Sequence, residues 1–175
     1  GVLYGLVMNS AYSIIHEAEH NLFHPNHRIN TSAGVILALF FPAPYHLIRQ
    51  THLGHHLRNR SDDEAFDLYF EGQKPIYRFG QIYSLLNGFF WFSIAITTVL
   101  APVLPKILES RFWKFDRMSE AITESLNPKY WRWIILESLG AVLLHGSLIY
   151  FTGAKPHHYL FVLYIFGVMW SSMQY

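Results

Sequence analysis

The sequence predicts an all-α protein: an integral membrane helical bundle with interfacial or re-entrant helices and a histidine cluster at its cytoplasmic face. Hydrophobic residues make up 51% of the 175 positions and charged residues only 14%, whereas soluble domains carry about 25% charged residues. Long apolar stretches alternate with short polar segments. Eight of the eleven histidines lie between His16 and His56. We interpret residues 1–175 as a single domain.

Five apolar stretches are candidates for membrane segments, since a helix needs about 20 apolar residues to span a bilayer. They are residues 1–15, 33–48, 82–104, 133–151 and 159–170. We expect the first, fourth and fifth to cross the membrane. The second contains Pro42 and Pro44, and the third contains Pro102. Because proline interrupts helical hydrogen bonding, we expect these two stretches to dip into the membrane and return, or to lie in its interface.

The distribution of basic residues supports this topology. Twelve of the thirteen lysines and arginines fall in segments that it places in the cytoplasm, and only Lys155 lies in the short loop 153–158. That asymmetry agrees with the positive-inside rule. In an alternative topology the third and fourth stretches cross as a pair, which puts the basic segment 106–132 outside. Within that segment, residues 119–126 predict an amphipathic surface helix that ends at Asn127-Pro128.

Composition also excludes several functions. The formal net charge is +1, so no basic face for binding nucleic acid is predicted. The chain contains no cysteine, which excludes disulfides, all-cysteine iron–sulfur clusters, thiolate zinc sites and thiol nucleophiles. Imidazole is therefore the main ligand that the chain can offer to a transition metal.

Two histidine clusters have the spacing of metal ligands on helices, where residues three or four apart share a face. The first contains His16 and His20, with His24 four residues further on, and the second contains His52, His55 and His56. Five or six imidazoles exceed what one tetrahedral zinc ion needs, so we expect a dinuclear centre. Its predicted ligands are His16, His20, His52, His55 and His56. Since both clusters must reach the same ions, the chain between them cannot make a single crossing.

Acidic residues beside the clusters are predicted to support the centre. Glu17 and Asp63, together with His24, are candidates for further metal ligands or for groups that orient the imidazoles. Glu19 and Asp62 are candidates for the second of these roles, and the alternative for all the carboxylates is a solvated acidic patch.

Other ionisable residues lie in or near the apolar stretches. Glu137 and His145 are eight residues apart, roughly on one face of a predicted membrane helix. An ionisable group there is a functional candidate, and the alternative is an interhelical hydrogen bond. For the remaining histidines we favour hydrogen bonding over metal binding. These are His27, His46, His157 and His158, and the same holds for His145.

The pattern His-x-x-x-His followed by His-x-x-His-His resembles the first two histidine boxes of the membrane-bound fatty acid desaturase superfamily. That superfamily also contains fatty acid and alkane hydroxylases and carotenoid ketolases. The flanks are similar too: Arg49-Gln50 precede the second box, and Asn59 and the acidic run Asp62-Asp63-Glu64 follow it. The end of the chain, 170–175, resembles the late transmembrane helix that leads towards a further histidine. The resemblance covers essentially the whole chain in order.

The resemblance implies a non-haem di-iron oxidase that uses two iron ions and O2 to attack an unactivated C–H bond of a lipid chain. We favour a fatty acyl desaturase that introduces a double bond, with a hydroxylase or ketolase acting on an alkane, lipid or carotenoid as the alternative. The chain has neither cysteine nor a Gly-x-Gly-x-x-Gly motif. Electrons are therefore expected from an external ferredoxin, rubredoxin or cytochrome b5-like donor. The boxes are expected on the cytoplasmic side of a bacterial inner membrane or an endoplasmic-reticulum-type membrane.

One departure from the superfamily concerns its third histidine box, which follows the last membrane helix. The sequence both begins and stops inside apolar runs, at Gly1 and Tyr175, so we expect a truncated domain that lacks this box and is inactive by itself. His157-His158 are not expected to substitute, because the predicted topology places them on the opposite side.

Two alternatives belong to other functional classes. Residues 16–20 match His-Glu-x-x-His, the signature of zinc metalloproteases, in which Glu17 is the general base. Against this, Phe23 and Asn26 replace the glycine and histidine of the extended protease motif, and the second cluster has no role. The other alternative is a metal-binding or transport protein without catalysis. Metal analysis separates the three.

Overall fold

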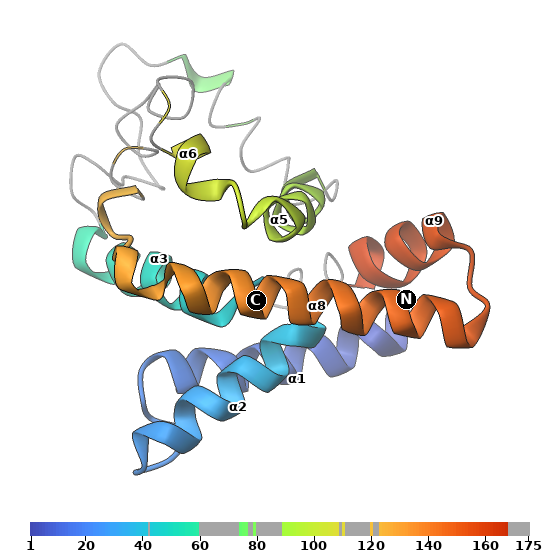
Figure 1. Ribbon diagram of the computed structural model, residues 1–175, viewed down its shortest axis with the longest axis horizontal. Coiled ribbons are helices and arrows are strands. Elements are labelled where there is room, and N and C mark those ends of the chain that lie inside the picture. The colour runs from blue at the N-terminus through green and yellow to red at the C-terminus, as the bar shows by residue number, and fades with distance from the viewer. Residues whose placement is uncertain are drawn as a thin grey trace.

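The fold is all-helical over the residues that a computed structural model describes, which are 1–41, 43–59, 74–76, 79, 89–108, 110, 120 and 123–167. No strand occurs in this part of the chain. The elements are α1 (Val2–Glu19), α2 (His27–Phe40), α3 (Tyr45–Arg58), α5 (Phe89–Leu100), α6 (Leu104–Leu108), η1 (Pro128–Tyr130), α8 (Trp131–Thr152), α9 (Pro156–His158) and the π-helix η2 (Tyr159–Ile165). Figure 1 shows α8 along the middle of the molecule, with α1 and α2 on one side and α5 and α6 on the other.

A tight turn folds α2 back along α1 (Figure 1). Asn21 adopts a positive φ of 59°, which asparagine tolerates better than most residues. Asn26 then begins α2, because its side chain accepts a hydrogen bond from the Arg28 N–H at 2.9 Å. Asn30 is fully buried and accepts a hydrogen bond from the His24 N–H at 3.0 Å. These amide contacts fix the loop that follows the first histidine box.

The core lies where α1, α2 and α3 meet. Met8, Ala11, Ile15 and Ala18 are buried on α1, and their spacing of three or four residues forms one helical face. Tyr45 packs against them with 1% exposure, and its hydroxyl donates a hydrogen bond to the Ala18 carbonyl at 2.9 Å. The buried apolar face therefore sets the position of α1 against the start of α3.

Gly34 allows the close approach of α2 to α3. A Cβ placed there would lie 2.2 Å from Cε2 of Tyr45, and that ring is held by its buried hydroxyl. We expect Gly34→Ala to destabilise the fold by about 1–3 kcal/mol through overpacking, measured as thermal unfolding of the protein in detergent. Gly146→Ala is the control, because a Cβ at this α8 position meets nothing within 4 Å. Equal melting temperatures for the two variants would contradict the expectation.

The second apolar stretch is interrupted, as its prolines predicted. α2 ends at Phe40 and α3 begins at Tyr45, and the two helices are bent by 107°. Pro44 is the N-cap of α3 and offers no side-chain hydrogen bond. Together the two helices have the length and hydropathy of either a broken span or a re-entrant loop. The break leaves backbone groups at both helix ends that need partners.

Side chains from elsewhere satisfy the end of α2. Nε2 of His145 lies 2.9 Å from the Leu39 carbonyl, so it donates, because a carbonyl oxygen only accepts. Nδ1 of the same ring lies 2.7 Å from the Tyr159 hydroxyl, which donates to it. The Tyr4 hydroxyl donates to the Phe40 carbonyl at 2.9 Å. His145 is thus a structural hydrogen-bonding residue, the role favoured from the sequence.

Glu137 satisfies the start of α3. Its carboxylate accepts hydrogen bonds from the His46 backbone N–H at 3.0 Å and from Nδ1 of the His46 ring at 2.5 Å. Glu137 and His145, which were predicted to share a face of α8, therefore hold the two sides of the helix break: Glu137 binds the start of α3, and His145 binds the end of α2. The carboxylate has 6% side-chain exposure. The His46 ring also stacks with Tyr130 and Trp133.

Among the described residues, one helix is by itself long and apolar enough to cross a membrane. It spans Pro128–Thr152, over 25 residues, and contains the predicted fourth stretch. Large apolar side chains on it remain exposed, such as Leu143 at 69%. The crossings expected for 1–15 and 159–170 stay predictions. Pro102 lies between α5 and α6. Of the predicted surface helix at 119–126, residues 120, 123 and 124 are helical, 125 and 126 are not, and 119, 121 and 122 lie outside the described residues.

Candidate metal centre

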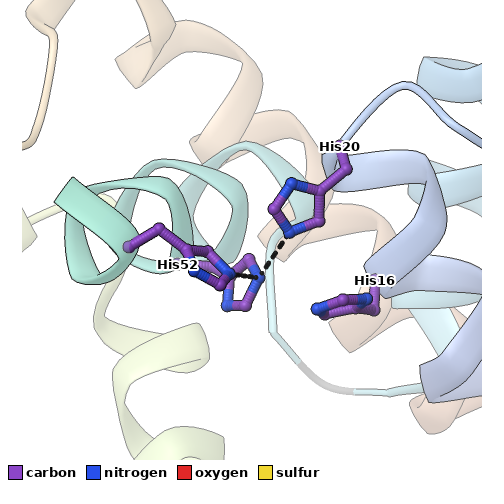
Figure 2. Close-up of side chains that lie close together, drawn as sticks. His16, His20 and His52 are labelled. Atoms are coloured by element: carbon purple, nitrogen blue, oxygen red, sulfur yellow. Dashed lines mark hydrogen bonds between the residues drawn. The ribbon is translucent and has the colours of Figure 1, made fainter. Parts of the chain in front are cut away.

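Four histidines from the two predicted clusters meet between α1 and α3. His16 and His20 come from the last turn and the C-cap of α1, and His52 and His56 come from α3. One ring nitrogen of each lies within 4.8 Å of the others. Figure 2 shows the rings of His16, His20 and His52 directed towards one another across the two helices. A pair of residues four apart in each helix therefore produces one cluster.

The closest contacts join the Nε2 atoms. Nε2 of His52 lies 3.0 Å from Nε2 of His20 and 3.1 Å from Nε2 of His56. Nitrogens that share one ion at about 2.1 Å stand roughly 3.0–4.2 Å apart. These two pairs already have the spacing of ligands on one ion. Across the full set of four, the nitrogens lie up to 4.8 Å apart, slightly more than that range. The donor set therefore fits a transition metal that binds imidazole.

Side chains of α3 hold the two boxes together through the backbone of α1. The last carbonyls of a helix have no partner inside it. The Tyr45 hydroxyl accordingly donates to the Ala18 carbonyl, and Nε of Arg49 donates to the Glu19 carbonyl, each at 2.9 Å. These contacts flank His20 and His52, so the end of α1 and the middle of α3 are positioned as one unit.

The surroundings of the cluster lower the pKa of two of its imidazoles, His20 and His52. Burial lowers the pKa of His52 to about 4, and the neighbouring histidines His16, His56, His20 and His55 lower it further. Burial and His16 likewise lower the pKa of His20. A neutral imidazole keeps the lone pair that binds a metal ion. His52 therefore keeps its lone pair well into the acidic range, and the lowered pKa of His20 favours its neutral form in the same way.

Glu19 is the buried carboxyl group of this region, with 2% exposure. Burial raises its pKa to about 8, and the positive charge of Arg49 opposes this rise. Its Oε2 lies 3.8 Å from Nε2 of His52. Glu17, by contrast, is half-exposed, and its Oε1 lies 3.6 Å from Nδ1 of His16.

The other predicted site residues lie outside the cluster of four. The ring of His55 is 5.8 Å from that of His56, measured between centroids, but its nitrogens do not join the group. His24 makes local contacts instead: its Nδ1 accepts a hydrogen bond from the Asn26 N–H at 2.9 Å. Asp62 and Asp63 lie outside the described residues. The sequence did not predict the role of Tyr45, and it indicated Arg49 only as a flank of the second box, because a contact with a backbone carbonyl leaves no residue pattern.

These observations define a class of protein: over the described residues it is all-helical, and imidazoles from two of its helices converge on one point. A family model described as "Fatty acid desaturase" matches residues 1–175, which is the whole chain. The protein therefore belongs to the fatty acid desaturase family, and the match confirms the resemblance noted from the two boxes. It is accordingly an oxidoreductase of lipid metabolism. Neither the curated proteins nor the solved structures contain a match.

Proposed function

We propose that the protein is an O2-dependent fatty acyl desaturase with a centre of two iron ions. The observation that carries the proposal is the convergence of His16, His20, His52 and His56, from two boxes 32 residues apart, onto one point. Family membership supplies the reaction class. His55, beside His56 on α3, is proposed as a fifth ligand.

Each part of this chain has a defined role in the proposed enzyme. When bound, the iron pair supplies O2 activation and removal of hydrogen from the acyl chain. The histidines hold the metal as neutral ligands. Tyr45 and Arg49 keep the two boxes in register through the carbonyls of α1. Electrons come from an external ferredoxin, rubredoxin or cytochrome b5-like protein, since the sequence has no cysteine or dinucleotide motif.

An acyl chain is the proposed substrate because the histidine cluster lies at the end of an apolar helix. Along α1, large side chains remain exposed, including Leu3 at 79% and Val7 at 61%. Such a surface suits contact with lipid. We place the cluster at the cytoplasmic face of a bacterial inner membrane or an endoplasmic-reticulum-type membrane, on the distribution of basic residues.

The test is to express the gene product that contains this chain in a host whose own desaturase is deleted. We expect new double bonds in the host acyl chains, and two irons per protein by metal analysis. The empty vector is the control. Hydroxylated or oxidised lipids would assign the hydroxylase or ketolase reaction instead. One zinc with peptide cleavage would assign the protease, and exchangeable metal with unchanged lipids would assign a transport role.

A further inference from the structure

Glu19 lies in the first histidine box but is not one of its histidines. On α1 it is three residues after His16, so the two side chains lie on the same side of the helix. Its side chain is buried between α1 and α3, with 2% exposure. Its Oε2 faces Nε2 of His52 at 3.8 Å. That nitrogen is also the atom in contact with His20 and His56.

This contact does not explain the burial of the carboxylate. A distance of 3.8 Å is too long for a hydrogen bond, and a buried carboxylate is costly unless it is paired or binds a metal. Among the described residues Arg49 forms no ion pair with this carboxylate, because its Nε donates to the backbone carbonyl of Glu19 and its charge acts on the carboxylate only from further away. An oxygen and a nitrogen that share one ion at about 2.1 Å stand roughly 3.0–4.2 Å apart, a range that includes the 3.8 Å between Oε2 and Nε2. A shift of less than about 1 Å would bring the two atoms to the shorter end of that range, the spacing of adjacent ligands at right angles.

We propose that Glu19 is a carboxylate ligand of the iron held by His52, an inference that rests on the function proposed above. The centre then has mixed imidazole and carboxylate donors, a combination typical of non-haem iron. The carboxylate cancels one of the two positive charges that neutral imidazoles leave on a divalent ion. Glu17 does not take this role, because its side chain is half-exposed.

Glu19→Gln tests the proposal, because it removes the charge and keeps the shape. The purified protein is titrated anaerobically with Co²⁺, and both its affinity and its visible d–d bands are recorded. We expect affinity to fall by at least about 10–100-fold, the loss seen even when a supporting residue is removed, and the bands to change in position. Glu19→Asp should recover part of both. Glu124→Gln, at an exposed glutamate, is the control and should leave both unchanged.

Infrared difference spectra test ligation without relying on the glutamine variant. With ¹³C-labelled glutamate, adding Co²⁺ should shift one labelled carboxylate band in the wild-type protein, and this shift should disappear in Glu19→Asp. Unchanged d–d bands in Glu19→Gln, or a labelled shift that persists in Glu19→Asp, would overturn the proposal. If the wild type still binds iron, the proposed function stands. A wild type that binds no iron would overturn both.

Discussion

Replacing His52 with alanine should remove the bound iron and the lipid product together. Nε2 of His52 is the atom that contacts both His20 and His56, so its loss separates the two boxes. Removing a residue that only supports a ligand lowers metal affinity about 10–100-fold, and we expect a loss of at least about 100-fold for the ligand itself. Iron content and the acyl-chain profile of the host measure the two effects.

His158→Ala is the matched control for this substitution. His158 is exposed at the end of α9, and among the described contacts its ring meets only that of His157, in an edge-to-face arrangement. We expect it to retain iron and product at the wild-type level. If His52→Ala kept two irons per protein, the assignment of the centre to these boxes would be wrong.

Replacing Glu137 with leucine should give the largest loss of stability in the described part of the chain. The carboxylate and the His46 ring are both largely buried, and breaking a buried pair by removing one partner costs about 3–5 kcal/mol. The start of α3 also loses the acceptor for its backbone N–H. We therefore expect an unfolding temperature well below that of the wild type in detergent, accompanied by weaker iron retention.

Two further variants distinguish the contribution of the Glu137–His46 side-chain contact from that of the backbone contact at the start of α3. Glu137→Gln keeps an oxygen for the backbone N–H, so it should lose less stability than Glu137→Leu. The double variant His46→Ala/Glu137→Leu should lose less stability than the two single variants together, because stability losses are not additive when the substituted residues interact directly. Additive losses would show that the two side chains are not coupled.

The elements that depend on local spacing could be predicted from the sequence. Residues four apart within each box, together with prolines between the boxes, predicted helices that return to one point, and the structure brings His20 to 3.0 Å from His52. The metal role itself remains a prediction. Family membership was also predicted correctly, since the two boxes in order are specific.

Contacts that depend on packing between distant helices could not be predicted. The sequence placed Glu137 and His145 on one face but did not assign their partners, because His46 lies 91 positions from Glu137 and Leu39 lies 106 from His145. Which imidazoles of the second box enter the cluster also depends on how α3 is rotated. That rotation is set by contacts such as the one between Tyr45 and Ala18, so the separation of His55 from the cluster appears only in the folded protein.

The hydrogen bonds that Glu137 and His145 of α8 make to the two sides of the helix break have a consequence for biosynthesis. All four clustered histidines have been synthesised once His56 leaves the ribosome, but Glu137 and His145 are added much later. Until then, the end of α2 and the start of α3 lack the α8 partners that hold them. A nascent chain halted before α8 would therefore contain every clustered histidine and the Tyr45 and Arg49 contacts between α1 and α3, but not the side chains that hold the helix break. We therefore expect the helix break to reach its final geometry only after α8 has been added to the chain.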